Sequence, residues 1–486
     1  MIFDMKKRLA IIGNRMATGR LLDELSRRNA GRMYAITVFG EEPHGCYNRI
    51  LLGRVLSGGT TDEITLKSPA WYAQNDVTLE SGVRVEKVDT VARQLVTTDS
   101  ETHSYDAVVF ATGSAAFIPK IDGLRLAEGT VKPGVFVFRT VADCTAMRAY
   151  AHPAASAVVV GGGLLGLEAA KSLCDLGLHV TVLQNSDTLM NAQLDKLGGD
   201  MLRRAIEKMG IYVRTGVSTQ EVIGDDKATA VRLSDGSVFP AELVVLACGI
   251  APRTEVAKAA NVPVKRAIVV NDRMSTAIPG VYAVGECAEH DGKVYGLVEP
   301  IWDQCGVLAD VLTAANPRAR YTGSKVYARL KVVGVEVASM GLTESERDTD
   351  EVIQVIEDRK GIYRKLIVRD GKLAGAMLVG SAEAAPVLIQ LYDRGDPLPP
   401  NRLDVLASPG GGLSGPEAAG PEVCNCHHVT EGALVEAIKG GCTTLPMLSE
   451  CTKAGTGCGS CRGQLANLLL KHAPRAEAVG ANGVAH

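Results

Sequence analysis

The sequence predicts an α/β protein in which two Rossmann-like dinucleotide-binding domains are followed by a small α+β domain and a small helical metal-binding domain. Over the first 300 or so residues, short β-branched runs alternate with helical stretches, and two of these runs lead into glycine-rich turns. Near the end, six of the twelve cysteines crowd between Cys424 and Cys461. A length of 486 residues suits three or four domains.

Changes in composition divide the chain into expected segments. These are a first nucleotide-binding domain at 1–150, completed by about 270–320, a second at 151–269, an α+β domain at 321–400, a Gly-, Pro- and Ser-rich linker at 401–421, a cysteine-rich domain at 422–472 and a tail at 473–486. The strands expected in the α+β domain are Lys331–Val337, Glu351–Ile356, Arg364–Val368 and Ala374–Val379.

Composition and charge exclude several function classes. Hydrophobic residues make up 46% of the chain, charged residues 22%, and the net charge is only −3, so there is no basic field for nucleic acid. The apolar run that begins at Leu9 stops at Gly13, far short of a signal sequence, and no run of about 18 apolar residues follows. We therefore expect a cytoplasmic protein that binds neither nucleic acid nor membrane.

The clearer glycine-rich turn lies in the second nucleotide-binding domain. Residues 157–160 form a β-branched strand, and a G-x-G-x-x-G motif then opens a helix. We expect Gly161 to make the tight turn, Gly163 to let the backbone approach a pyrophosphate, and Gly166 to let helix and strand pack closely. This pattern predicts a site for NAD(P)H.

The end of the next strand bears on which nicotinamide cofactor binds. An acid at this position would accept a hydrogen bond from a ribose 2′-hydroxyl, and an arginine would hold a 2′-phosphate. The residue is Gln184, which follows the strand at 179–183 and is neutral. The sequence therefore favours NADH only mildly over NADPH.

The first glycine-rich turn is interrupted. It begins Gly13-Asn14-Arg15 and ends Thr18-Gly19, so Arg15 stands at the close-approach position and Thr18 at the helix-packing position. A side chain at Arg15 requires a different backbone path or a shifted pyrophosphate, although its charge could meet the phosphates directly. We still expect FAD here, because of the segments that follow.

An acid for the adenosine ribose is available after the next strand. Residues 35–39 run into Glu41 and Glu42, of which Glu41 is better placed. The alternative is that the two glutamates form a solvated acidic turn.

Three later strands support the arrangement of two nucleotide sites. Residues 105–114 end in Ala-Thr-Gly, residues 244–253 are their counterpart around Gly249, and residues 281–288 end in a Gly-acid pair. With the two turns, these segments resemble the two-dinucleotide-domain flavoprotein superfamily of pyridine-nucleotide reductases, over about residues 8–310.

That resemblance implies roles for particular residues. Thr112 and Gly113 would abut the flavin, Gly285 and Glu286 would contact its ribityl or pyrophosphate region, and Glu168 would border the nicotinamide. Family members usually have Asp where this chain has Glu286. No catalytic acid or base is expected, since hydride transfer belongs to nicotinamide and flavin.

Two further features near the expected flavin leave alternatives open. Arg49 and Arg54 lie where a charge beside the flavin is plausible, but surface salt bridges are an equal alternative. The chain lacks the paired redox cysteines of disulfide-reducing members, although Cys46 alone could act as a redox thiol. Otherwise we expect six isolated cysteines to be buried thiols, namely Cys46, Cys144, Cys174, Cys248, Cys287 and Cys305.

The cysteine-rich segment has the spacing of a metal site. Cys424 and Cys426 form C-x-C, and Cys458 and Cys461 form C-x-x-C. Four thiolates suit zinc or an iron–sulfur cluster. The glycine-rich stretch 451–461 and the Cys-Asn-Cys-His start resemble the bacterioferritin-associated-ferredoxin-like [2Fe-2S] domain over about residues 422–472, and that resemblance makes these four cysteines the ligands.

Four other residues of this segment have secondary expectations. Cys442 and Cys451 are left over, and we expect them to be buried thiols unless one replaces a ligand. His427 and His428 are expected to lie behind the ligands or at the surface. Gly455, Gly457 and Gly459 would leave backbone amides free to donate to cluster sulfurs.

Nearly the whole chain resembles the N-terminal half of the NADH-dependent assimilatory nitrite reductase large subunit, and most closely the electron-transfer subunit of assimilatory nitrate reductase. The resemblance rests on these two domain types together with residues 39–49, 189–195 and 294–300. Nitrite reductases continue into a sirohaem region with further cysteines, whereas the 25 residues after Cys461 contain none.

The resemblance implies electron flow from NADH to FAD, to the [2Fe-2S] cluster and then to the catalytic subunit of assimilatory nitrate reductase. Three alternatives stay open: electron input to a nitrite reductase, a stand-alone NADH oxidase or peroxidase that uses Cys46, and a redox or iron-handling binding protein.

Overall fold

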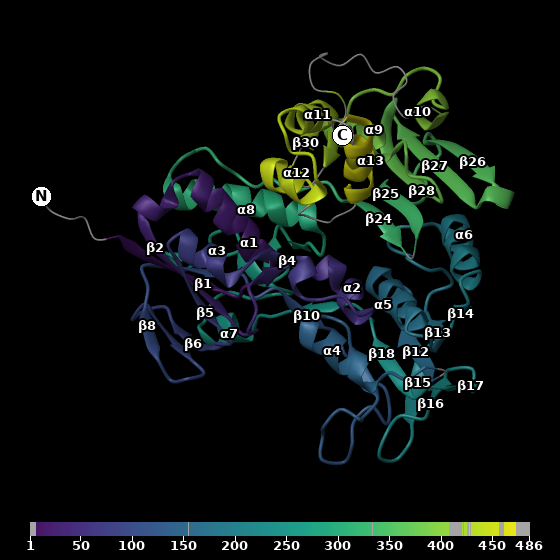
Figure 1. Ribbon diagram of the computed structural model, residues 1–486, viewed down its shortest axis with the longest axis horizontal. Coiled ribbons are helices and arrows are strands. Elements are labelled where there is room, and N and C mark those ends of the chain that lie inside the picture. The colour runs from purple at the N-terminus through teal and green to yellow at the C-terminus, as the bar shows by residue number, and fades with distance from the viewer. Residues whose placement is uncertain are drawn as a thin grey trace, which may run out of the picture.

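The computed structural model describes residues 6–153, 155–332, 334–407, 420, 422–424, 427, 429–455 and 461–472. Figure 1 shows the α/β domains of the first half of the chain, a separate antiparallel sheet in green, and a group of short helices in yellow at the C-terminal end. The predicted fold class is confirmed: two parallel-sheet domains are followed by an α+β domain and a small helical domain.

The first domain is built on a five-stranded parallel sheet with the order β21-β9-β1-β2-β5. The strands are β1 (Lys7–Ile12), β2 (Tyr34–Gly40), β5 (Val77–Ser81), β9 (Ala107–Phe110) and β21 (Val281–Ala283). The central strand β9 is wholly buried and β1 is buried from Leu9 onward, as strands covered on both faces must be, whereas the edge strand β5 is mostly half-buried or exposed. Helix α1 (Met16–Arg27) packs against α8 (Val298–Thr313), so residues near 300 pack with the first domain.

The second domain repeats this plan with the strand order β11-β18-β12-β13-β14. Its elements are β11 (Val135–Val137), β12 (Ser156–Val160), β13 (His179–Leu183), β14 (Tyr212–Arg214), β18 (Leu243–Leu246), α5 (Leu164–Asp175) and α6 (Lys196–Glu207). Strands β10 (Ser114–Ala116) and β19 (Ile250–Pro252) pair antiparallel and connect the two domains, because one follows the Ala-Thr-Gly strand and the other its counterpart.

Smaller elements surround these two sheets. They are β3 (Cys46–Tyr47), β4 (Thr65–Lys67), β6 (Val85–Asp89), β7 (Gln94–Thr97), β8 (Thr102–Ser104), β15 (Thr219–Ile223), β16 (Ala230–Leu233), β17 (Val238–Pro240), β20 (Ile268–Val270), β22 (Ala288–His290), β23 (Lys293–Val294), α2 (Leu52–Leu56), α3 (Pro69–Gln74), α4 (Val141–Tyr150) and α7 (Glu255–Ala259).

The α+β domain is an antiparallel sheet with the order β24-β25-β28-β27-β26, covered by α9 (Ala385–Arg394). Its strands are β24 (Tyr327–Val332), β25 (Val335–Gly341), β26 (Glu351–Glu357), β27 (Ile362–Arg369) and β28 (Lys372–Val379). The single strand predicted at Lys331–Val337 is wrong. That segment is a hairpin between β24 and β25, which turns at Gly334 with φ +88°.

The expected linker begins later than predicted. Helix α10 (Asp404–Ala407) lies inside the predicted range, and its Val405 and Leu406 are buried in the core of the α+β domain. Residues 408–419 and the expected tail at 473–486 lie outside the described residues.

The C-terminal domain packs against the first domain. It consists of β29 (Glu422–Cys424), β30 (Val429–Thr430), α11 (Glu431–Lys439), α12 (Leu445–Thr452) and α13 (Arg462–His472). Its buried side chains belong to the same hydrophobic core as α1 and α8. In Figure 1 the yellow helices accordingly lie beside α8, with the green sheet on their other side.

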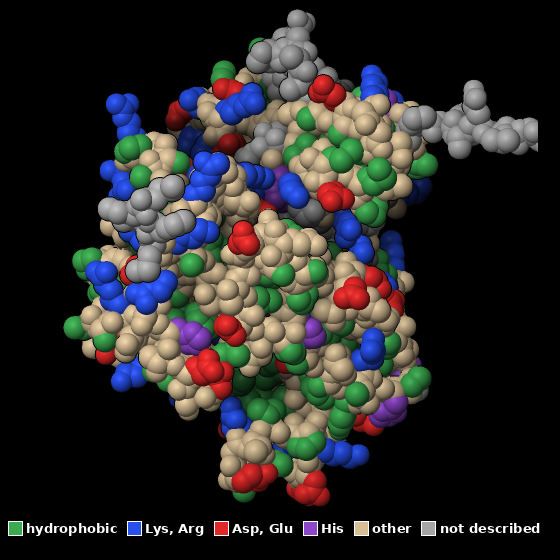
Figure 2. Space-filling model, turned by 60° about the vertical axis from the view of Figure 1, so that its left-hand side comes forward, with side chains coloured by type: hydrophobic (Ala, Val, Ile, Leu, Met, Phe, Trp, Pro, Cys, Tyr) green, Lys and Arg blue, Asp and Glu red, His purple; other side chains and the backbone are tan. Residues whose placement is uncertain are grey.

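No helix in the described part of the chain is long and apolar enough to cross a membrane. Figure 2 shows Lys and Arg side chains interspersed with Asp and Glu side chains over the face that it draws, so this face carries no field of a single sign.

Candidate functional site

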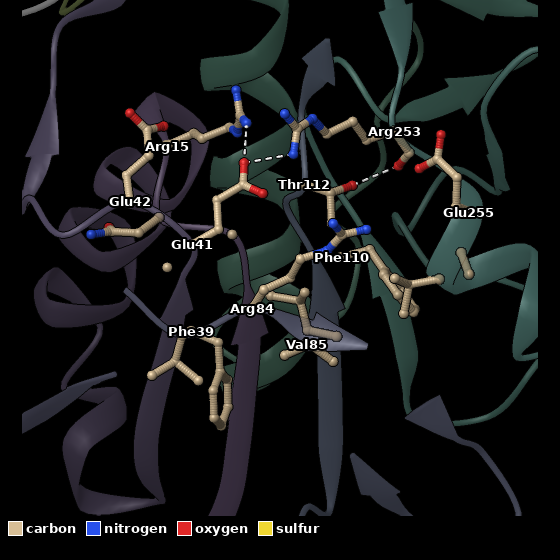
Figure 3. Close-up of a pocket in the computed structure, with 17 residues that line it drawn as sticks. Arg15, Phe39, Glu41, Glu42, Arg84, Val85, Phe110, Thr112, Arg253 and Glu255 are labelled. Atoms are coloured by element: carbon tan, nitrogen blue, oxygen red, sulfur yellow. Dashed lines mark hydrogen bonds and ion pairs between the residues drawn. The ribbon is translucent and has the colours of Figure 1, made fainter. Parts of the chain in front are cut away.

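The first cavity, called here the Glu41 cavity, lies at the carboxyl ends of β1, β2 and β9. Its wall includes Gly13, Asn14, Arg15, Glu41, Thr112 and Arg253. Arg15 and Arg253 both donate to Oε1 of Glu41, at 2.9 and 2.5 Å, as Figure 3 shows. Burial alone would raise the pKa of Glu41, but the two guanidinium groups hold it below its ordinary value. Glu41 is therefore an anchored carboxylate and not a solvated turn.

The backbone at Arg15 follows the same path as at the matching glycine of the second turn. Arg15 has φ −115° and ψ −177°, and Gly163 has φ −83° and ψ −178°, so both are extended. The Arg15 side chain lies against Gly113, where an added Cβ would meet Arg15 Cδ at 2.8 Å, and its Nη1 donates to the Ser114 carbonyl. Arg15 thus needs no unusual backbone. Its side chain lines the Glu41 cavity and also a second cavity next to it.

Thr18 replaces the helix-packing glycine through a hydrogen bond. In the second domain, a Cβ at Gly166 would lie 1.9 Å from the Gly161 carbonyl oxygen. In the first domain, the Thr18 hydroxyl instead donates to the Gly13 carbonyl at 2.5 Å. Gly13 itself has φ +105°, and a Cβ there would meet the Ala111 carbonyl at 2.4 Å. The interrupted motif therefore keeps its tight turn.

The second cavity, the Trp302 cavity, adjoins the first at Arg15. Its wall also includes Ala17, Arg49, Gly113, Arg139, Glu286 and Trp302. Arg49 pairs with Glu42 and is buried, so it is a wall residue and not a surface salt bridge. Arg139 pairs with Glu286, which also accepts a hydrogen bond from the Ser114 hydroxyl at 2.7 Å.

Three buried donors in the wall of the Trp302 cavity have no hydrogen-bond partner in the described structure. They are Arg49 Nε, Arg139 Nε and Trp302 Nε1. Buried polar groups without a partner are costly and call for an explanation. A flavin carries ring nitrogens and carbonyl oxygens that accept hydrogen bonds, so the donor set fits FAD, and Arg15 would supply a positive charge for its phosphates.

Three residues predicted to bind FAD lie behind the cavity walls or at their edges. Gly19 faces Cys46 inside α1, where a Cβ would come within 2.7 Å of the sulfur. Gly285 has φ +88° and donates its N–H to the buried Gln304 at 2.9 Å. Asn14 accepts a hydrogen bond from the Tyr72 hydroxyl at 2.6 Å, which orients its side chain at the cavity.

The third cavity, the Gln184 cavity, lies between the two domains at the N-terminus of α5. A Cβ at Gly161 would lie 2.3 Å from the Ala247 carbonyl oxygen, whereas Cβ atoms at Gly163 and Gly249 would meet nothing within 4 Å. The first glycine therefore makes the turn, and the other two leave backbone open toward the cavity. Such a cradle at a helix N-terminus suits the pyrophosphate of a dinucleotide.

Gln184 is held within its own loop. Its side-chain oxygen accepts from the Gly162 N–H at 2.8 Å, and its nitrogen donates to the Ser186 hydroxyl at 2.5 Å. Glu168 lies further along α5 and is not part of the cavity walls found among the described residues. Burial raises its pKa to about 8, and its Oε2 has no hydrogen-bond partner there.

The Trp302 and Gln184 cavities adjoin each other. Leu164 and Leu165 of α5 and the Arg139 side chain line both. A nicotinamide entering from the second domain would meet a flavin in the first at this point, which is the geometry that hydride transfer requires.

Cys46 does not have the environment of a redox thiol. It is fully buried beneath α1, its Sγ donates to the Arg15 carbonyl, and burial raises its pKa to about 12. It is absent from the described cavity walls. Arg54 is exposed and is not a wall residue either.

Several wall residues were not identified from the sequence. Arg139, Arg253 and Trp302 lie outside the glycine-rich motifs and reach the cavities only through the packing of distant segments. The sequence carries one weak signal for Arg253, because this residue ends the segment around Gly249 that matches the Ala-Thr-Gly strand. In the structure the Thr112 hydroxyl donates to the Arg253 carbonyl.

Two of the four predicted cluster ligands lie in the described structure. Cys424 and Cys461 are 2% exposed and belong to one core, although 37 residues separate them. Cys426, Cys458 and His428 lie outside the described residues. Both thiols are thus buried inside the C-terminal domain, where thiolate ligands of a cluster would lie.

The other two cysteines correct an expectation. Cys442 and Cys451 are joined by a disulfide across nine residues, and Cys451 is exposed, so they are not two buried thiols. The loop after α11 and the end of α12 come close enough to pair them. His427 is half-buried, and its Nδ1 lies 2.9 Å from Arg20 Nη1.

Three known protein families match parts of the chain. Residues 7–305 match the family described as pyridine nucleotide-disulphide oxidoreductase. Residues 327–395 match the rubredoxin NAD+ reductase C-terminal domain, and residues 422–471 match the BFD-like [2Fe-2S] binding domain.

Individual relatives cover almost the whole chain. It is 38% identical to the nitrite reductase [NAD(P)H] of Bacillus subtilis (strain 168) over 96% of its length, and 38% identical to the assimilatory nitrate reductase electron transfer subunit of the same organism over 96%. The chain spans only 58% and 59% of these two relatives.

A solved structure shows the same fold. The covalent putidaredoxin reductase–putidaredoxin complex aligns with a TM-score of 0.74 and 22% identity, over 84% of this chain and 100% of that chain. With the family come the cofactors that the motifs predicted, FAD, a nicotinamide dinucleotide and a [2Fe-2S] cluster. The chain therefore belongs to the pyridine nucleotide-disulphide oxidoreductase family, and it is an oxidoreductase with a C-terminal [2Fe-2S] binding domain.

Proposed function

We propose that this chain is an NADH-dependent flavoprotein reductase of the cytoplasm that passes electrons by way of FAD and a [2Fe-2S] cluster to a partner catalytic subunit, the assimilatory nitrate reductase. The observation that carries the proposal is the position of the Trp302 cavity. At Leu164 and Leu165 this cavity adjoins the Gln184 cavity, which holds the dinucleotide cradle. Its wall also includes Trp302, whose ring centroid is 6.4 Å from that of His427 in the cysteine-rich domain.

The chain's own residues bind and orient the reactants. Gly163 and the N-terminus of α5 would hold the dinucleotide phosphates, and Arg15 would balance the charge of the FAD phosphates. Leu164 and Leu165 present an apolar surface where the two rings meet, which excludes water from the transfer. FAD supplies the conversion between two-electron and one-electron chemistry when it is bound.

A preference for NADH is supported by the neutral side chains that surround Gln184. Both ends of the Gln184 amide are used within its loop, next to Asn185 and Asn191. The described wall has two cationic side chains, Lys120 and Arg139, and Arg139 is paired with Glu286. Arg214 accepts a backbone hydrogen bond from Gln184, but its side chain pairs with Asp235 and is not part of the described cavity wall. A lower KM for NADH than for NADPH is the expected result.

The partner is proposed from the relatives. One is named as an electron transfer subunit of assimilatory nitrate reductase, and it matches over almost the whole of this chain. A second candidate, electron input to nitrite reduction, is favoured by the equal identity to a nitrite reductase. Native complex purified without oxygen would be assayed for molybdenum, sirohaem, flavin and iron. Molybdenum supports nitrate, and sirohaem without molybdenum would contradict it.

The electron path has its own test. In Cys461→Ser, NADH should still bleach the flavin while reduction of the partner or of a ferredoxin-type dye is lost. Cys174→Ser is the matched control, because Cys174 lies in the second domain, where its Sγ donates to the Met209 carbonyl. Dye reduction that survives in Cys461→Ser would show that the cluster is not on the path.

Two alternatives make different predictions. An oxidase or peroxidase that uses Cys46 would turn over with oxygen or peroxide and lose activity in Cys46→Ala, which the burial of this thiol disfavours. A redox or iron-handling binding protein would oxidise NADH only slowly, even with a ferredoxin-type dye present.

A further inference from the structure

We propose that Trp302 is the relay between the flavin cavity and the iron–sulfur domain, and that Arg20 is the positioning residue that holds the relay against the cysteine loop. This inference rests on the proposed function and deepens it. It concerns how one chain keeps an electron acceptor next to its own flavin site.

Trp302 reaches from the flavin cavity to the cysteine-rich domain. It lies on α8, is 6% exposed, and forms part of the wall of the Trp302 cavity with Arg49, Arg139 and Glu286. On its other side, its ring centroid is 6.4 Å from that of His427 at an interplanar angle of 54°. His427 directly follows the predicted ligand Cys426. A single aromatic side chain thus spans from the cavity to the ligand loop.

Its indole nitrogen is a second observation at the same place. Trp302 Nε1 is buried without a hydrogen-bond partner in the described structure. A buried tryptophan N–H normally finds an acceptor. An acceptor atom of a bound cofactor in the cavity would satisfy this donor and bring the indole into direct contact with the flavin site.

Arg20 ties the first domain to the cysteine loop. Its guanidinium lies 5.7 Å from the Trp302 ring centroid, its Nη1 is 2.9 Å from His427 Nδ1, and its Nη2 is 2.8 Å from Glu24 Oε1. Because an arginine only donates, Nδ1 of His427 must accept. The Arg20 side chain is 12% exposed, so these contacts are shielded from water. The aromatic pair is therefore fixed by α1.

The electron transfer leaves the protein side chains chemically unchanged. Each electron that leaves reduced flavin reduces one cluster, and Trp302 ends in the state in which it began. The two electrons of one hydride need two such passages, and the proton passes to solvent. Electrons tunnel faster through bonded, closely packed atoms than across open space, and the Trp302 indole supplies such atoms between the cavity and His427.

The test separates the relay from the proposed function. Anaerobic stopped-flow mixing with NADH would follow flavin bleaching and cluster reduction in the full chain. In Trp302→Leu, cluster reduction should slow by about an order of magnitude relative to flavin bleaching recorded in the same trace, and Trp302→Phe should restore most of that ratio. Cluster reduction in Trp302→Leu at the unaltered rate would overturn the relay. Failure of the unaltered chain to reduce its cluster would instead overturn the proposed function.

A second readout distinguishes relay from packing. Hydrogen exchange of α11 and α13 would report whether the C-terminal domain stays docked, and Trp302→Met keeps the site filled if Trp302→Leu does not. Retained protection with slow cluster reduction supports the relay. Lost protection in both variants would make Trp302 a packing residue and overturn it.

The chain offers an optical control, since it has only two tryptophans. In a Trp71→Phe background, Trp302 emission reports on the junction alone. Arg20→Gln should change that emission and slow cluster reduction, and Arg20→Lys should restore part of both. Unchanged emission and rate in Arg20→Gln would remove the positioning role.

Discussion

The two substitutions that interrupt the first glycine-rich motif are explained by single contacts. Thr18 adds a hydroxyl that bonds to the Gly13 carbonyl, and Arg15 keeps an extended backbone while its side chain reaches Glu41. A reading of the motif by glycine positions predicts a weakened site. The structure shows instead that a hydrogen bond from Thr18 replaces the close packing of a glycine. It also shows that the extended backbone at Arg15 tolerates a side chain.

The glycines of the intact motif should separate binding from folding. In Gly163→Ala the added methyl points into open cavity, so stability should hold while the KM for NADH rises by about an order of magnitude with little loss of kcat. In Gly166→Ala the methyl meets the Gly161 carbonyl, which should cost about 1–3 kcal/mol or more of folding stability. Steady-state kinetics and urea unfolding check the pair. Equal stability of the two variants would contradict these roles.

Glu168 should make stability depend on pH. Burial raises its pKa from 4.5 to about 8, so the folded chain holds a proton that the unfolded chain loses. Stability from this group is fully present below the unfolded pKa and falls by about 1.4 kcal/mol per pH unit as the pH rises toward the folded pKa.

Glu168→Gln should remove that dependence. Urea midpoints of the cofactor-free chain between about pH 5 and pH 8 would show a gap between the variant and the unaltered chain that widens with pH. The exposed Glu86→Gln is the matched control. A gap that stays constant across this interval would mean that Glu168 is ionised at neutral pH.

At the scale of elements, the sequence predicts whatever is encoded by local pattern. The strands before both turns, the helix α5 and the strands β26 to β28 have clear apolar periods and lie where they were expected. The β24–β25 hairpin was missed because β-branched residues continue through its turn, and only Gly334 marks the reversal. The linker was set too early because Val405 and Leu406 are buried by tertiary contacts, which composition does not report.

The disulfide between the loop after α11 and the end of α12 should stabilise the C-terminal domain. Closing a loop of nine residues restricts the unfolded chain, which is worth roughly 2–3 kcal/mol. The double variant Cys442→Ser/Cys451→Ser should lower the stability of this domain by that amount, read from hydrogen exchange of α13. Dithiothreitol should have the same effect on the unaltered chain and none on the variant. A further loss in the variant on reduction would show that other thiols are responsible.

At the scale of the molecule, hydrophobic cores cross the domain boundaries that the sequence suggests. One core of the described residues joins the first domain to the C-terminal domain, and another joins the second domain to the α+β domain through Tyr363, Met377 and Val379. Sequence patterns locate each domain but not these junctions, because a junction depends on side chains that are far apart in the chain. The wall residues Arg139, Arg253 and Trp302 were missed for the same reason.

A buried ion pair fixes the second of these junctions. Lys365 of β27 donates to Asp195, the N-cap of α6, at 2.9 Å, and both side chains are 3% exposed. Tyr363 donates to the same carboxylate oxygen at 2.5 Å. In Lys365→Met the carboxylate stays buried with its cation removed, and breaking such a pair costs about 3–5 kcal/mol.

Unfolding in urea should show that loss for Lys365→Met and very little for Lys360→Met, because Lys360 is 70% exposed and pairs only at the surface. Adding Asp195→Asn to Lys365→Met should recover part of the stability, since a neutral amide still caps α6 and no charge is left buried. If Lys365→Met matches its surface control, the buried ion pair does not hold the junction, and the other contacts across it, such as the apolar packing of Tyr363 and Met377, carry its stability. The α+β domain would then be free to shift against the Gln184 cavity without the cost of separating a buried charge.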